Sequence, residues 1–202
     1  LEVLGLNKAE ATFIGANETD PVVYNYLGVS SDQEIIWDAA AGSFLKGASP
    51  LVLLKSVSIL LQQSRLSFEE LQAMIETRFV KPDGTAALSI VPASTCKPSE
   101  MRLPALTPEH LDRLHRFTRL WHKLGWTMRE LDLAIEALGG QLTRATLIGL
   151  ARLKLLNQRL ELPVASLVGG LHQLETRSWI NSLMEGDTVQ PSLYSAIFQR
   201  AA

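Results

Sequence analysis

The sequence contains a single cysteine, Cys96, in 202 residues, and neither sign of charge predominates. One cysteine cannot form a disulfide within the chain, and it cannot supply the several thiolates of a structural zinc site. Lys and Arg number 19 against 21 Asp and Glu, a formal net charge of −2, so the chain lacks the basic surface that nucleic acid binding requires. We therefore expect neither a disulfide-stabilised domain nor a nucleic acid partner.

Long hydrophobic runs are also lacking, because no apolar run reaches the roughly 18 residues that a membrane-spanning helix needs. The longest candidate, PLVLLKSVSILL at residues 50–61, is interrupted by Lys55, which predicts a buried helix and no direct membrane insertion. The stretch that begins at Leu1 does not have the pattern of a signal peptide. Both ends of the chain fall within a helical pattern, so we interpret it as a part of a longer protein.

Alternation of apolar and polar residues, the pattern of a half-buried strand, is nearly absent. LSIVPA at residues 88–93 is the one short candidate, and Pro92 interrupts it. Elsewhere apolar residues recur every three or four positions, which predicts amphipathic helices. Two such stripes are formed by Leu111, Leu114, Phe117, Leu120, Trp121 and Leu124, and by Leu131, Leu133, Ile135 and Leu138.

Capping residues mark the starts of the predicted helices. In a capping box, a Ser, Thr or Asn side chain accepts a hydrogen bond from the amide three residues later, where a Glu side chain reaches back. Proline directly after a cap is tolerated at the first helical position, and glycine pairs such as Gly139-Gly140 end a helix. The predicted capping boxes are Asn7/Glu10, Ser31/Glu34, Ser67/Glu70 and Thr127/Glu130, and the Pro-marked starts are Ser49-Pro50 and Thr107-Pro108.

Three stretches repeat one plan, in which a helix, a turn, an apolar residue and a capping residue precede a second helix. The apolar residue is expected to pack on the one five positions later, as a hydrophobic staple that fixes the angle between the helices. The third stretch has Pro163 in place of the cap, and the spacing of the three is irregular. The sequence thus predicts an all-α fold, an irregular bundle of stacked helical hairpins. The staple pairs are Leu66/Leu71, Trp126/Leu131 and Leu162/Leu167.

Residues 81–106 differ from the rest, because four of the nine prolines fall there. That is too many for a helix interior. We predict one long Pro-rich loop between a helical half at residues 1–80 and a second at residues 107–202, all within a single domain.

Few side chains suggest a catalytic or metal-binding site. His115 and His122 are seven positions apart, about two turns, and so lie on the same face of one helix. Metal-binding histidines on a helix usually sit four apart, and neither has a carboxylate or cysteine at a suitable offset, so we predict no metal site. His110 and His172 are isolated.

Glu130, Asp132 and Glu136 could pair for acid–base work, but Glu130 has a capping role and Arg129 can compensate their charge. We interpret the three acids as a solvated helix face. Two further pairs have the acid four positions before the base, which is the stabilising order on an exposed helix face. They are Glu109/Arg113 and Asp112/Arg116.

Tryptophan side chains could stack on a sugar or a base, but Trp121 lies within an apolar stripe and Trp126 at a staple position, so we predict both in the core. Trp37 and Trp179 also have apolar neighbours. Cys96, in the Pro-rich segment, is predicted to be inert. Motifs for a phosphate loop, a dinucleotide or a serine nucleophile are absent from the sequence, so we predict no catalytic residue and no cofactor.

Four segments carry a family resemblance: LSFEELQAMIETRFVKP (66–82), STC (94–96), LTPEHLDRLHRFTRLWHKLGWTMRELDLAI (106–135) and QPSLYSAIF (190–198). In that order they resemble the A component of bacterial Tc insecticidal toxin complexes, which is related to the Salmonella virulence plasmid A protein. The third segment is the most specific, because its order of Leu, Arg, Trp and Gly-Trp is long. The fourth departs after QPSLY, where the family more often continues Leu-Phe-Leu-Asn. The signature residues are Leu66, Ser67, Glu70, Leu71, Arg119, Trp121, Gly125, Trp126, Thr127, Glu130 and Leu131.

The resemblance implies a part of the α-helical shell of a secreted toxin. In that family the A component is a homopentamer whose shell encloses a translocation channel, through which an enzyme packaged in the B–C components enters a host cell. The channel and the regions that bind a host receptor would lie elsewhere in the A chain. The implied partners of this segment are the rest of its own chain, other A protomers and the B–C components, and it would perform no chemistry itself.

Because histidine titrates near neutral pH, His115 or His122 would make a shell interface pH-responsive if it lay there. A different class of function is a self-standing helical repeat module that binds a partner peptide in a groove. An enzyme would require His122, Glu130 and Asp132 to meet in one pocket.

Overall fold

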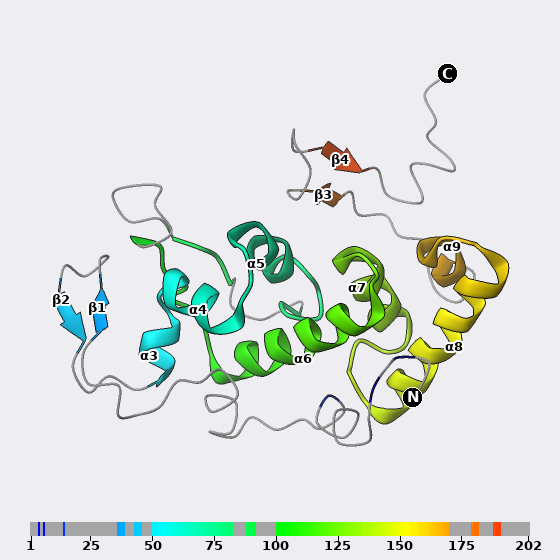
Figure 1. Cartoon of the computed structure of the whole chain (residues 1–202), viewed down its shortest axis with the longest axis horizontal. Helices are drawn as coiled ribbons and strands as arrows, with labels where there is room; N and C mark the ends of the chain where they lie inside the picture. Colours follow the sequence, from blue (N-terminus) through cyan, green and yellow to red (C-terminus); the bar gives the residue numbers. More distant parts are fainter. Residues whose placement is uncertain are drawn as a thin grey trace. The chain divides into compact units, whose positions relative to one another are not determined.

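The structure is a computed structural model that describes residues 4, 6, 14, 36–38, 43–45, 50–82, 88–91, 100–169, 179–181 and 188–190. The predicted helical character is confirmed for the described residues within 50–75 and 108–169, which contain α3 to α9. The bundle arrangement, the Pro-rich loop and the single-domain division stay predictions. In chain order the elements are β1 Ile36–Asp38, β2 Ser43–Leu45, α3 Pro50–Leu54, α4 Val57–Ser64, α5 Phe68–Ile75, α6 Pro108–Leu124, α7 Met128–Ala137, α8 Arg144–Leu160, α9 Val164–Gly169, β3 Trp179–Asn181 and β4 Thr188–Gln190 (Figure 1).

Two short antiparallel hairpins were not predicted from the sequence. β1 pairs with β2, with Trp37 opposite Phe44, and β3 pairs with β4, with Ile180 opposite Val189. Each strand has only three residues, which is too short to produce a recognisable alternation of apolar and polar positions. In residues 88–91, the described part of the segment considered as a strand, Val91 forms a backbone bridge to Arg102.

The described elements fall into two compact units. One unit contains α3, α4, α5 and α6 as far as His115. The other contains residues 77–79, α6 from Arg116 onward, and α7, α8 and α9. Fully buried side chains occur in both units, among them Leu53, Leu54, Leu71 and Met74 in the first and Phe117, Leu131, Leu147 and Leu150 in the second.

In the first unit, residues 100–103 pair with the break between α3 and α4. The break occurs at Lys55 and Ser56, where the Val57 N–H donates to the carbonyl of Met101 at 3.1 Å and the Lys55 carbonyl accepts from Leu103 at 2.9 Å. These contacts satisfy backbone groups that the interrupted helix leaves without partners. As predicted, α3 begins at Pro50, directly after Ser49.

α5 begins with the capping box predicted at Ser67. The Glu70 N–H donates to Ser67 Oγ at 3.1 Å, and the Ser67 N–H donates to Glu70 Oε2 at 2.8 Å. The staple residues Leu66 and Leu71 are both buried. Arg65 closes α4 with a positive φ of 57°, which turns the chain toward the cap.

The turn between α6 and α7 has the same plan. α6 ends at Leu124, and Gly125 follows it with a φ of +69°, which suits a residue without a Cβ. Thr127 and Glu130 then form a predicted capping box at the start of α7. The staple residue Trp126 is 9% exposed, and Leu131 is fully buried. Trp121, predicted in the core, is only half-buried and makes an edge-to-face contact with the ring of His122, with 4.7 Å between centroids.

α7, α8 and α9 contact one another in the second unit. Gly139 and Gly140, both at positive φ, end α7 as predicted, and Thr143 caps α8 by accepting from the Thr146 N–H at 3.2 Å. The third staple prediction is wrong, because Leu162 is 44% exposed. Without a polar cap at Pro163, the turn before α9 does not bury the preceding leucine. The capping boxes predicted at Asn7/Glu10 and Ser31/Glu34 lie outside the described residues.

Replacing Trp126 with alanine should lower the free energy of unfolding by about 3–5 kcal/mol, because a large buried ring is removed from the staple. Trp121→Ala is the matched control: the same truncation at a half-buried ring should destabilise the chain clearly less. Urea unfolding followed by far-UV circular dichroism measures both. Equal losses for the two variants would contradict the assignment of Trp126 as the anchor of this turn.

Candidate functional site

The side chain of Asp132, on α7, is a deeply buried carboxylate that binds backbone amides. Asp132 is 5% exposed, and its two oxygens accept the backbone N–H groups of Arg78 and Phe79, each at 2.9 Å. The prediction that this residue lies on a solvated face is therefore wrong. Asp132 falls on the buried side of α7 together with Leu131 and Ile135.

The chain at residues 77–79 explains why a carboxylate is needed there. α5 ends at Ile75, so the amides that follow lose the regular helical pattern of acceptors. Thr77 and Phe79 are buried, so water has little access to the backbone N–H groups of this segment as a hydrogen-bond acceptor. A carboxylate has two oxygens and no donor, so one side chain can accept both N–H groups at once.

Burial raises the pKa of Asp132 from its ordinary value of about 4 to about 6. Loss of hydration is the largest cause, and the two N–H donors from Arg78 and Phe79 oppose it by favouring the charged form. The nearby carboxylate of Glu136 raises the pKa a little further. Asp132 thus titrates in a range where an exposed aspartate is fully ionised.

Glu136 forms an ion pair with Arg78, whose backbone N–H binds Asp132. Both side chains of the pair are about one third exposed, 40% for Arg78 and 32% for Glu136, so solvent screens much of the attraction. The sequence suggested Arg129 for this compensating role. The base that pairs with Glu136 instead comes from a segment 58 residues away in the chain.

Arg116, on α6, is a second buried ionic group that binds backbone. It is 2% exposed, and its guanidinium donates to the carbonyls of Ile14 at 2.6 Å and Leu142 at 2.5 Å. The same group lies 6.0 Å from the ring centroid of Phe79, which stacks on Phe117. The prediction of an exposed Asp112/Arg116 pair is wrong, since both residues are buried.

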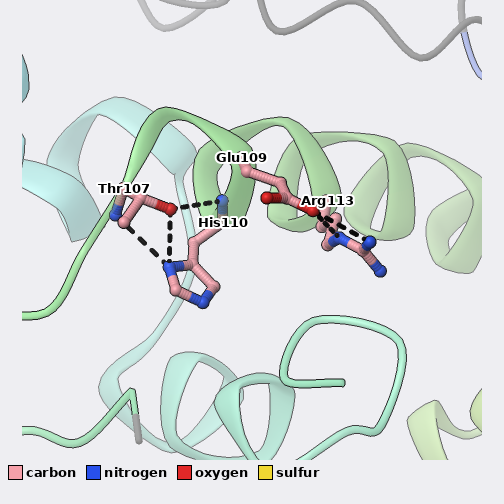
Figure 2. Close-up of polar contacts among 4 residues, drawn as sticks. All are labelled: Thr107, Glu109, His110 and Arg113. Carbon is pink, nitrogen blue, oxygen red and sulfur yellow. Dashed lines mark hydrogen bonds and ion pairs between the residues drawn. The ribbon is translucent and has the colours of Figure 1, made fainter. Parts of the chain in front are cut away.

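Figure 2 shows the start of α6, where His110 takes part in a cap. His110 Nδ1 accepts the Thr107 N–H at 3.3 Å and lies 2.9 Å from Thr107 Oγ1, while the His110 N–H donates back to that hydroxyl at 3.3 Å. A histidine therefore occupies the position that Glu or Gln holds in a capping box. One turn on, Glu109 and Arg113 form the predicted ion pair, with 3.0 Å between Nη2 and Oε1, but only the Glu109 side chain is well exposed, at 58% against 12% for Arg113.

Burial lowers the pKa of His110, the carboxylate of Glu109 opposes this shift, and Arg113 acts in the same direction as burial. The cap needs Nδ1 as an acceptor, which requires the neutral imidazole. Protonation would replace that acceptor with a donor that faces the Thr107 N–H. The sequence treated His110 as isolated, although its position three residues after Thr107 was a signal for this role.

The other predicted site residues differ in exposure and in the contacts they make. His115 is half-buried, His122 and Arg119 are exposed, and Glu130 is engaged by the Thr127 cap. His122, Glu130 and Asp132 thus have three separate environments. In the ranges that the structure describes, no group of three His, Cys, Asp or Glu side chains is arranged to hold a metal ion. Cys96, His172 and the side chains of Trp37 and Trp179 lie outside the described residues.

Comparison with known proteins does not assign the chain to a family. No family model matches it, and neither the curated proteins nor the solved structures contain a match. Among the described residues, no helix has both the length and the apolar character to cross a membrane.

Asp132→Asn should remove a pH dependence of stability between about pH 4 and 6. Because the folded state has the higher pKa, it binds the proton more tightly than the unfolded chain, so the free energy of unfolding of the wild type falls as pH rises through this window. Urea midpoints across the window measure the slope. Glu69→Gln, at an exposed acid on α5, is the control and should keep the slope, and a slope unchanged in Asp132→Asn would refute the assignment.

At neutral pH, Asp132→Ala should lower the free energy of unfolding by at least about 2 kcal/mol, since two backbone N–H groups lose their acceptor. The free energy of unfolding of Asp132→Asn should lie between those of the wild type and the alanine variant, because its single oxygen can accept from only one of the two N–H groups. Hydrogen exchange at the amides of Arg78 and Phe79 should speed up in the alanine variant. Unchanged protection of both amides would show that Asp132 does not hold this segment.

His110→Gln should retain the α6 cap and keep its stability at acidic pH, where the wild type becomes less stable. With a lowered pKa in the folded state, His110 makes the free energy of unfolding fall as pH falls below about 6.5. Glutamine supplies the acceptor without titrating, whereas His110→Ala should lose about 1 kcal/mol at neutral pH. Denaturant titrations at pH 5 and pH 8 separate the variants. A glutamine variant as acid-sensitive as the wild type would rule out this role.

Proposed function

We propose that this chain is a structural part of the α-helical shell of a Tc-type toxin A component, a secreted pore-forming and translocating protein that delivers a toxic enzyme into host cells. The proposal rests on the resemblance of residues 66–82 and 106–135 to that family. These segments coincide with α5 and with the α6–α7 hairpin, whose boundaries carry capping boxes and buried staples. In this role the chain performs no catalysis.

One observation carries the mechanical interpretation. Two charged side chains that are buried on α6 and α7, Arg116 and Asp132, bind backbone groups of other segments. Such contacts stiffen irregular chain between helices, because each donor or acceptor has a single geometry that satisfies it. A wall that must keep its shape until it opens benefits from that stiffness.

The proposed partners follow from the same role. Within the full toxin, this segment would pack on the rest of its own A chain and on neighbouring protomers of a homopentamer. The B–C components would be further partners, and a host receptor would bind the assembled protein through other regions.

The parent protein provides the test. The full-length protein should assemble into a pentamer with a closed helical shell, visible by mass photometry and negative-stain electron microscopy. It should also open at a defined pH. A parent protein that stays monomeric across the pH range would overturn the proposal.

The histidine hypothesis is tested in the same assembly. Replacing His115 and His122 together with glutamine should shift the pH at which the shell opens, if either lies at a shell interface. An unchanged opening pH would remove both residues from the mechanism while leaving the shell proposal intact.

A further inference from the structure

Helix α8, yellow in Figure 1, has apolar residues on two opposite sides. One side is buried and contains Leu147, Leu150 and Leu153. The opposite side exposes large apolar residues over about three turns and just beyond the helix end. These are Ile148 (40% exposed), Leu155 (38%), Leu156 (43%), Leu160 (54%) and Leu162 (44%).

Two arginines run along the middle of this exposed face. Arg152 and Arg159 are seven positions apart and therefore nearly aligned along the helix, with Ile148 and Leu155 on one side of them and Leu156 on the other. Both arginines are exposed, and neither forms an ion pair within the described part of the chain. α8 itself contains no Asp or Glu.

A contiguous patch of exposed leucines marks an interaction surface more often than a surface that stays in contact with water. The two guanidinium groups in its middle require a partner with negative charge. An occupant must offer apolar side chains to the leucines and carboxylates to the arginines. We propose that this face of α8 docks an amphipathic helix of a protein partner, with acidic residues in the middle of its apolar surface. The inference does not depend on the proposed shell function.

Two other occupants fit less well. A helix that lies in a membrane surface keeps its basic residues on the polar side, whereas Arg152 and Arg159 divide the apolar side of α8. A second copy of the chain that paired α8 with α8 would bring four arginines together in a low-dielectric contact, where like charges repel strongly. Charge complementarity therefore favours an acidic helix.

Binding to two synthetic helices tests the inference with the whole chain. Each fluorescein-labelled peptide has about 20 residues, enough to span α8, and an identical leucine pattern. One carries glutamate in the middle of the apolar face, and the other carries lysine there. Fluorescence anisotropy should show binding of the glutamate peptide at least tenfold tighter than that of the lysine peptide.

Variants of α8 locate the binding. Leu156→Gln with Leu160→Gln should weaken binding of the glutamate peptide by tenfold or more. Arg152→Glu with Arg159→Glu should reverse the preference, so that the lysine peptide binds better. Val52→Gln is the matched control, since Val52 is an exposed apolar residue of α3 with 37% exposure. All these sites are exposed, and circular dichroism checks that each variant is folded.

Other outcomes overturn the inference. Absence of binding, equal binding of the two peptides, or binding unaffected by the α8 variants would show that this face does not recognise an acidic helix. Binding to vesicles of phosphatidylcholine and phosphatidylserine at a ratio of about 7:3, lost in the leucine variant, would assign the face to a membrane instead. A dimer in sedimentation that the leucine variant dissolves would assign it to a second copy.

Discussion

The hydrogen bonds from the amides of Arg78 and Phe79 to the carboxylate of Asp132 are the contact on which the second unit most depends. They fix a buried piece of irregular chain, residues 77–79, against α7. Phe79 is thereby placed where it stacks on Phe117 and lies under the guanidinium of Arg116. The polar contact determines the position, and the apolar packing around it supplies most of the stabilisation.

A buried carboxylate that serves two amides is stabilised by them and destabilised by the loss of water, and its pKa of about 6 shows that the second effect is larger. Replacing such a group with an apolar one does not solve the problem, because the amides would remain buried without an acceptor. Arg116 presents the opposite case, a buried cation that serves carbonyls of residues 14 and 142. Together these groups specify the geometry of chain segments that lack regular secondary structure.

Asp132 and His110 respond to pH in opposite directions, since protonation favours the folded form of the aspartate and opposes the cap made by the histidine. The two residues belong to different units, and burial is the largest cause of the pKa shift in each. For a protein proposed to open at a defined pH, they place pH sensitivity in internal contacts, whereas the sequence directed attention to His115 and His122.

The sequence by itself determined the local features of the helices. The capping boxes at Ser67 and Thr127 and the glycine end of α7 depend on residues within one turn of each other, so short patterns predict them. Residues 36–38 and 43–45, by contrast, form strands too short for any pattern to indicate.

Tertiary structure alone decided which charged residues are buried. Asp112/Arg116 and Glu109/Arg113 have identical spacing on α6, yet Asp112 and Arg116 are both buried, whereas the Glu109 side chain of the other pair is 58% exposed. For Arg116 the reason lies in segments that are distant in sequence, since its guanidinium binds the carbonyls of residues 14 and 142. A single helix cannot encode the position of those segments, and Asp132 could be recognised as an acceptor only when the amides it serves had been located.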